Sequence, residues 1–242
     1  MTLRIITRAE WGARYPDGYD VAPLPAQYLW LHHSVTLAPD LLPPFDDDDA
    51  AVRLLELIGQ QRFGAGMSYT FAVTPAGRVY QGVSLGRASA HTLGHNFDSR
   101  AVVLVGDYTT RRPTDAQLTA VAELVVLGRR NRWWTSWLSG GHRDAEPAGY
   151  TECPGDAGEA AIPEINRRAY LLATPIPTTE EDMGLIIVRA DGHGPLVLTD
   201  GFKRRNISNT ERAGWATAGV RELNLTGAPD SYDEMVSGLE PA

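Results

Sequence analysis

Apolar residues in the first part of the chain, up to about residue 173, follow two different repeats. Four short runs, apolar throughout or alternating with polar residues, are typical of β-strands: 28–35, 68–74, 78–81 and 101–105. Three longer segments indicate helices with one apolar face: about 50–62, 114–130 and 163–172. Because the two kinds of element are interspersed, we predict an α/β fold with a single mixed central β-sheet flanked by helices.

Local signals place the ends of several of these elements. Thr114 to Gln117 fits a capping box at the start of a helix, and Thr7 to Glu10 fits a second one that would open a short helix. Pro75-Ala76-Gly77 is a turn between two strands. The four acids from Asp46 to Asp49 are interpreted as a solvated loop that complements the positive end of the following helix. A cation site is the less favoured interpretation of this run, because such sites normally space their carboxylates along the chain.

The composition changes after residue 173. Residues 174–183 are rich in proline, threonine and acids, which is typical of a linker. Short apolar runs on either side of Asp191-Gly192-His193-Gly194, and a third run near 203–207, predict a β-rich module over 184–242. We therefore predict a large first domain over 1–173, a linker over 174–183 and a small C-terminal module over 184–242.

Composition and charge exclude several classes of protein. Hydrophobic residues make up 43% of the chain and charged residues 21%, as in soluble globular proteins. A net charge of −8 argues against nucleic acid as a partner. No apolar run approaches the roughly 20 residues that span a bilayer, so we expect no membrane insertion. The first residues lack the apolar core of a secretory signal, which predicts a protein made and kept in the cytoplasm.

Cys153 is the only cysteine in the chain, so it is a core residue, a nucleophile or a metal ligand. His142, eleven positions upstream, favours the last of these. Two further histidines, His32 and His33, close the apolar run that begins at Tyr28. Two histidines and one thiolate would form a zinc site with its fourth position open to water, which distinguishes a catalytic zinc from a structural one. The sequence therefore indicates a zinc hydrolase.

The combination of motifs resembles the peptidoglycan-recognition protein and type 2 amidase family, the zinc-dependent N-acetylmuramoyl-L-alanine amidases that include phage lysins. The resemblance covers residues 4 to about 173. It rests on these segments, which occur in the order of the family: Arg8-Ala9-Glu10-Trp11-Gly12-Ala13, Leu31-His32-His33-Ser34, Ser68-Tyr69-Thr70-Phe71, Ala90-His91, Gly94-His95-Asn96, Val105-Gly106-Asp107-Tyr108, Gly141-His142-Arg143-Asp144 and Cys153-Pro154-Gly155-Asp156.

The resemblance implies a role for particular positions. It makes His32, His142 and Cys153 the ligands of one catalytic Zn²⁺, with His33 on the opposite face of its strand. It makes Tyr69 and Thr151 catalytic residues near the scissile carbonyl. It also places two residues in the substrate groove, in contact with glycan or stem peptide or bracing the loop: His91 and Asn96.

The implied activity is hydrolysis of the amide bond between the lactyl group of muramic acid and L-alanine in bacterial peptidoglycan. Zinc lowers the pKa of its water from 15.7 towards about 7, and a hydroxyl donor stabilises the oxyanion. The layout of amidase, linker and small module resembles a phage endolysin, which waits in the host cytoplasm and degrades the cell wall after release. In that layout the module binds the wall.

Two other functions stay open from the sequence. The first is a non-catalytic peptidoglycan receptor on the same fold, although binding-only members of the family usually lack the cysteine ligand. The second is a regulatory protein that uses the fold to bind an intracellular partner.

Overall fold

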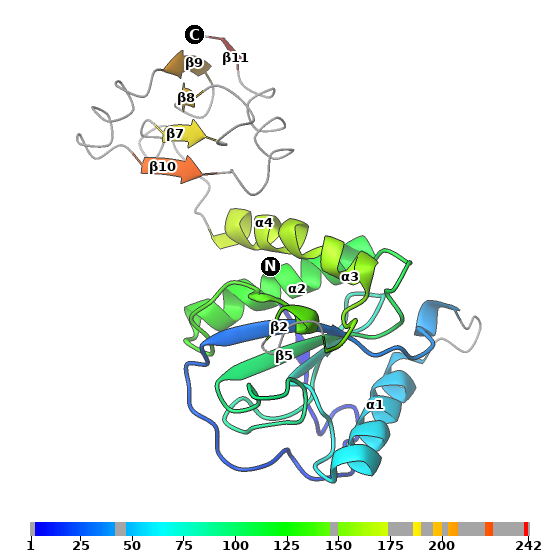
Figure 1. Cartoon of the computed structure of the whole chain (residues 1–242). Coiled ribbons are helices and arrows are strands. Elements are labelled where there is room, and N and C mark those ends of the chain that lie inside the picture. Colours follow the sequence, from blue (N-terminus) through cyan, green and yellow to red (C-terminus); the bar gives the residue numbers. More distant parts are fainter. Residues whose placement is uncertain are drawn as a thin grey trace. The chain divides into compact units, whose positions relative to one another are not determined.

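The computed structural model describes residues 3–41, 47–145 and 150–173, together with five strands nearer the C-terminus (Figure 1). The chain divides into two compact units, Met1–Ala173 and Thr174–Ala242. The predicted linker over 174–183 and the predicted turn at 191–194 lie outside the described residues.

A six-stranded sheet forms the centre of the first unit, in the order β1-β4-β3-β5-β2-β6. Only the β3–β4 pair is antiparallel, so the sheet is mixed, as predicted. Its strands have these bounds: β1 (Ile5–Ile6), β2 (Tyr28–His33), β3 (Phe71–Val73), β4 (Val79–Gln81), β5 (Ser99–Leu104) and β6 (Gly140–Gly141).

Helices cover both faces of this sheet, α1 on one side and α2 with α4 on the other (Figure 1). The helical elements are η1 (Pro39–Leu41), α1 (Asp48–Phe63), α2 (Asp115–Arg130), η2 (His142–Asp144), α3 (Asp156–Ala160) and α4 (Ile162–Ala173). The predicted capping box at Thr114 and Gln117 is present, with both of its reciprocal hydrogen bonds. None of the described helices is long and apolar enough to span a bilayer.

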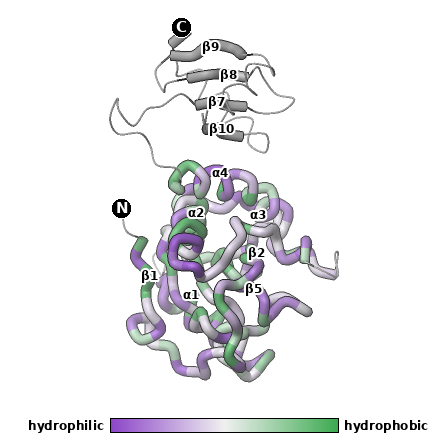
Figure 2. Tube along the Cα trace, turned by 90° about the vertical axis from the view of Figure 1, so that its left-hand side faces the viewer, coloured by the Kyte–Doolittle hydropathy of each residue, from purple (hydrophilic) through white to green (hydrophobic). Residues whose placement is uncertain are grey.

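Side chains that alternate along the strands form two separate cores, one on each face of the sheet. On β5, Val103 packs into the cluster beneath α1, whereas Val102 and Leu104 pack into the cluster beneath α2 and α4. Hydrophobic and hydrophilic stretches alternate along the trace of this unit (Figure 2). Because side chains alternate between faces, Leu31 belongs to the α2 side and His32 points to the α1 side.

Three local predictions were wrong in detail. Residues 8–12 form hydrogen-bonded turns instead of a short helix, although Thr7 donates to the Glu10 carboxylate from both its backbone N–H and its hydroxyl. Gly12 has a φ of 75°, which ends a helical path. The strand expected over 28–35 ends at His33, because Val35 has a φ of 55°. In the acidic run, Asp48 is buried and accepts a hydrogen bond from the Thr74 hydroxyl, so it is not solvated.

The described residues of the second unit form a five-stranded sheet in the order β10-β7-β8-β9-β11. The two apolar runs that flank 191–194 and the third run near 203–207 form strands, as predicted, and β7–β8 and β8–β9 are antiparallel pairs. The bounds are β7 (Ile186–Arg189), β8 (Leu196–Thr199), β9 (Lys203–Ile207), β10 (Arg221–Asn224) and β11 (Glu240–Pro241).

Candidate metal centre

The register of two parallel strands brings two of the predicted ligands together. Leu31 on β2 pairs with Gly141 on the edge strand β6, so His32, still within β2, and His142, directly after β6, lie side by side. Parallel strands carry their carboxyl ends to the same edge of a sheet. The two imidazole rings consequently lie with their centroids 4.5 Å apart.

The loop before α3 brings Cys153 to the same point. The Arg143 backbone N–H donates to the Cys153 carbonyl over 2.8 Å, which ties this loop to the residue after His142. The Cys153 Sγ accepts a hydrogen bond from the backbone N–H of His33 at 3.4 Å. Gly155 makes the close approach possible, because it has a φ of 81° and a Cβ there would lie 2.5 Å from the Tyr108 carbonyl.

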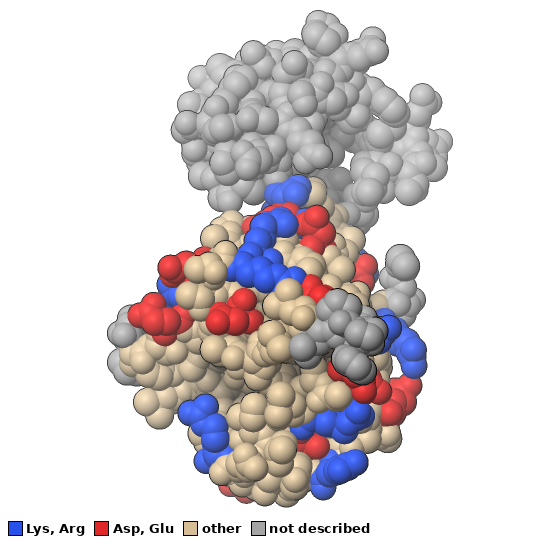
Figure 3. Space-filling model, turned by 90° about the vertical axis from the view of Figure 1, so that its right-hand side faces the viewer, with Lys and Arg blue, Asp and Glu red and all other residues tan. Residues whose placement is uncertain are grey.

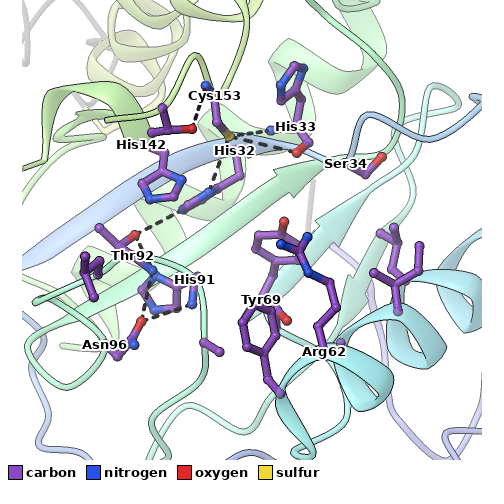
Figure 4. A pocket seen from close by; sticks show the side chains of 18 of the residues that line it. His32, His33, Ser34, Arg62, Tyr69, His91, Thr92, Asn96, His142 and Cys153 are labelled. Atoms are coloured by element: carbon purple, nitrogen blue, oxygen red, sulfur yellow. Dashed lines mark hydrogen bonds between the residues drawn. The ribbon is translucent and has the colours of Figure 1, made fainter. Parts of the chain in front are cut away.

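The three side chains fit a tetrahedral zinc ion. Each offers one ligand atom, and these atoms all lie within 4.8 Å of one another. Sγ of Cys153 and Nδ1 of His32 are 3.6 Å apart (Figure 4). Zinc–sulfur and zinc–nitrogen bonds of about 2.3 and 2.0–2.1 Å at a tetrahedral angle put such a pair about 3.6 Å apart. A cluster of His32, His142 and Cys153 is therefore consistent with a zinc site.

The protonation of these groups suits a cation. Burial, followed by the neighbouring imidazoles, lowers the pKa of His32 well below its usual value, and burial lowers that of His142 to about 4. Both rings are therefore neutral and can offer a lone pair. Burial raises the pKa of the Cys153 thiol to about 12. A coordinating metal deprotonates a thiol outright, so binding of zinc should release one proton at this site.

Each imidazole has a hydroxyl partner on one of its ring nitrogens. His32 Nε2 lies 3.4 Å from the Thr92 hydroxyl, and His142 Nε2 is hydrogen-bonded to the Tyr150 hydroxyl. Such partners fix the orientation and tautomer of ligand histidines. Neither Thr92 nor Tyr150 was predicted. Their place in the sequence, next to His91 and Thr151, is the one signal that could have found them.

His33 points away from the cluster, to the other face of β2. Its Nδ1 accepts a hydrogen bond from the Tyr108 backbone N–H at 3.2 Å and lies 3.6 Å from an Asp107 carboxylate oxygen. Burial lowers its pKa, against the opposing effect of Asp107. Its side chain therefore braces the segment after β5.

A pocket of about 1020 Å³ opens over the cluster, and all of the other predicted site residues line it: Tyr69, His91, Asn96 and Thr151. Tyr69 lies on the α1 side, beside Arg62, with its ring centroid 5.2 Å from that of His32 (Figure 4). Burial, then the nearby Cys153 thiol, raises the pKa of Tyr69 above its ordinary value, so the hydroxyl stays protonated. The Thr151 hydroxyl accepts a hydrogen bond from the Cys153 N–H at 3.2 Å.

His91 and Asn96 form the opposite wall of the pocket. Asn96 Oδ1 accepts hydrogen bonds from the backbone N–H groups of His91 and Thr92, at 3.0 and 2.9 Å, so its carbonyl oxygen braces this turn. Burial lowers the pKa of His91 to about 3, which makes the ring neutral. The Nδ1 atom of His91 lies 2.8 Å from the Thr92 hydroxyl.

Two acidic residues flank the ligands in sequence, Asp144 after His142 and Glu152 before Cys153. Asp144 accepts a hydrogen bond from the Gly141 N–H at 2.8 Å, which is a structural role. The Glu152 side chain is 93% exposed. Arg143 donates to the Glu152 carbonyl and pairs with Asp156 at 2.9 Å, which stabilises the loop that carries Cys153.

Charged groups on the surface are mixed in sign. On the face shown in Figure 3, basic and acidic side chains lie side by side and leave a broad uncharged band across the first unit. This face therefore does not present a continuous basic surface of the kind that binds nucleic acid.

Comparison with known proteins agrees with this geometry. The N-acetylmuramoyl-L-alanine amidase family model matches residues 22–156, which include all three ligands. The human N-acetylmuramoyl-L-alanine amidase is 34% identical over 154 residues, or 62% of this chain and 26% of that protein. Peptidoglycan-recognition protein LB of Drosophila melanogaster is 29% identical over 160 residues, or 64% of this chain and 65% of that protein.

Solved structures show the same fold. The Drosophila peptidoglycan-recognition protein LB structure matches with a TM-score of 0.57 at 29% identity, covering 66% of this chain and 93% of that one. The ectodomain complex of the recognition proteins LCa and LCx, solved with bound tracheal cytotoxin, matches with a TM-score of 0.57 at 28% identity, covering 67% and 95%. Structures in this family thus include complexes with peptidoglycan fragments. With a family model that matches more than half of its length and a shared fold, this chain belongs to the N-acetylmuramoyl-L-alanine amidase and peptidoglycan-recognition protein family.

Proposed function

We propose that this protein is a zinc-dependent N-acetylmuramoyl-L-alanine amidase that hydrolyses the amide bond between the lactyl group of muramic acid and L-alanine in peptidoglycan. The observation that carries the proposal is the convergence of His32, His142 and Cys153, with ligand atoms within 4.8 Å of one another beneath a pocket of about 1020 Å³. When bound, zinc polarises an amide carbonyl as a Lewis acid and makes water acidic enough to act as a nucleophile near neutral pH.

The side chains of the pocket supply the rest of the chemistry. Negative charge develops on the carbonyl oxygen during attack, and a hydroxyl group that stays protonated can donate a hydrogen bond to it. Tyr69 meets this requirement, since its pKa is raised and its ring lies against His32. Thr151 accepts a hydrogen bond from Cys153 and so keeps its own hydroxyl proton for a donor role towards the pocket.

The substrate class is supported by relatives. The human relative is named for this amidase activity, and the LCa–LCx complex was solved with tracheal cytotoxin. Because this chain spans about a quarter of the human enzyme, the activity of that whole protein is carried over only as a proposal. A non-catalytic receptor on the same fold is the second candidate, favoured only by the recognition proteins among the relatives.

Digestion of purified peptidoglycan tests the proposal. The zinc-loaded protein should release stem peptides that begin with a free L-alanine amino group, detected by mass spectrometry. A chelator should reduce this release to background, and added zinc should restore it, because the ligand cluster is the proposed catalytic centre. Binding of peptidoglycan by the zinc-loaded protein without any release of peptide would identify a receptor and contradict the amidase proposal.

The role of the second unit is a separate proposal. We infer that residues 184–242 bind the cell wall and raise the local concentration of the amidase on its substrate. A chain that ends at Ala173, the boundary of the first compact unit, should hydrolyse a soluble muropeptide normally but sediment less with purified walls than the full chain. Equal sedimentation of the two chains would rule out this role.

The place of the activity in a phage infection stays a prediction. An endolysin acts from the host cytoplasm on the wall after release, and causes host lysis. Expression in a bacterial cytoplasm together with a membrane pore should then lyse the cells, whereas expression without the pore should not. Survival of cells that contain both the protein and the pore would contradict an endolysin role. This result would not bear on the proposed amidase activity.

A further inference from the structure

A hydrogen-bonded chain runs from the candidate metal ligand His32 through Thr92 to His91. The Thr92 hydroxyl lies 3.4 Å from His32 Nε2 and 2.8 Å from His91 Nδ1. All three side chains are buried, with 1% to 6% of each exposed. At the far end of the chain, His91 Nε2 is shielded from solvent and has no hydrogen-bond partner among the described residues, although its ring lines the pocket.

The direction of each hydrogen bond follows from the chemistry of the groups. The Nδ1 of His32 faces the Cys153 sulfur, so a metal bound there leaves the proton of the neutral ring on Nε2. That N–H can only donate, and the Thr92 oxygen is its acceptor. The Thr92 hydroxyl has no other acceptor among the described residues, so its single proton is directed to His91 Nδ1, which accepts it. A neutral His91 that accepts at Nδ1 carries its own proton on Nε2.

We propose that Thr92 is a positioning residue that sets the tautomers of both histidines. It holds His32 with its Nδ1 lone pair towards the metal, and it presents His91 Nε2–H to the pocket as a donor for a carbonyl or carboxylate oxygen of the bound peptidoglycan fragment. The second part rests on the proposed function, because it takes the ligand of the pocket to be such a fragment. Figure 4 shows the path from His32 through Thr92 to His91.

Two variants distinguish the effect of the Thr92 hydroxyl group from the effect of the shape of its side chain. Thr92→Val keeps the β-branched shape of a buried residue and removes the hydroxyl, whereas Thr92→Ser keeps the hydroxyl. Loss of a partner to a ligand histidine typically lowers metal affinity by roughly 10–100-fold. We expect a loss of this size in the zinc affinity of Thr92→Val and a large recovery in Thr92→Ser. An unchanged zinc affinity in Thr92→Val would overturn the role of Thr92 towards His32.

The tautomers are read directly by NMR of the zinc-loaded full chain labelled with ¹⁵N-histidine, with the His91 signals assigned from a His91→Gln variant. We expect the Nε2–H tautomer of His91 in the wild type and in Thr92→Ser, and a loss of this preference in Thr92→Val. An Nδ1–H tautomer in the wild type, or the same tautomer in all three proteins, would overturn the proposal.

Titration with muramyl dipeptide tests the donor role. The His91 Nε2–H resonance of the wild type should move as the ligand binds, and the shift should be smaller in Thr92→Val. Saturable binding with no change in this resonance would show that His91 is not the donor. The tautomer is measurable whether or not the chain hydrolyses peptidoglycan, so failure of this inference is distinguishable from failure of the proposed function.

Discussion

Cys153→Ser should remove both the zinc and the amidase activity. A serine hydroxyl is not deprotonated at neutral pH, so the variant lacks the one anionic ligand of the cluster. The loss of zinc affinity should exceed the roughly 10–100-fold effect that is typical of residues that only contact a ligand. Zinc content after dialysis and peptide release from purified peptidoglycan measure the two effects separately.

The neighbouring histidines provide matched controls for this experiment. His142→Ala should behave like Cys153→Ser, because His142 belongs to the cluster. His33→Ala should retain zinc, because the His33 side chain lies on the opposite face of β2 and contacts Tyr108. If His33→Ala loses as much zinc as His142→Ala, or if Cys153→Ser keeps its metal, the proposed ligand set is wrong.

Tyr69→Phe should lower the rate of hydrolysis without loss of zinc. The change removes only the hydroxyl, and loss of one oxyanion donor typically lowers kcat by about 10²–10³. Burial raises the pKa of Tyr69, so the group stays a donor as the pH rises. The reduction should therefore be similar at about pH 6 and about pH 9, both below the ordinary tyrosine pKa of about 10.

Tyr15→Phe is a suitable control, since Tyr15 is on the surface, 36% exposed, and does not line the pocket. It should have wild-type turnover and metal content. Wild-type turnover in Tyr69→Phe would exclude that hydroxyl from the mechanism, while loss of its zinc would show that the ring supports the metal site instead.

The elements that carry long apolar patterns were predictable from the sequence. Strand β5 and helix α2 were predicted close to their observed ends, because buried side chains repeat along them and Thr114 and Gln117 cap the helix. Strand β6 was not predicted. It consists of Gly140 and Gly141, which have no side chains to form a pattern. This strand nevertheless determines the position of one predicted ligand, because its register with β2 places His142 beside His32.

The choice of ligands came from the resemblance, and their convergence came from the structure. The sequence alone left His32 and His33 as equal candidates, since adjacent residues on a strand point to opposite faces. The orientation of β2 in the sheet places His32 with Cys153. Thr92 and Tyr150 could not be identified from sequence, because their contacts depend on how the two imidazole rings are oriented in the folded site.

The hydrogen bond between the Arg143 N–H and the Cys153 carbonyl has a consequence for how this family can diversify. It closes the intervening segment at its base, so the spacing between the second and third ligands is independent of how many residues lie between them. Each doubling of a flexible segment costs only about 0.6 kcal/mol in closure entropy. We therefore expect insertions between His142 and Cys153 to leave the separation of these two side chains unchanged.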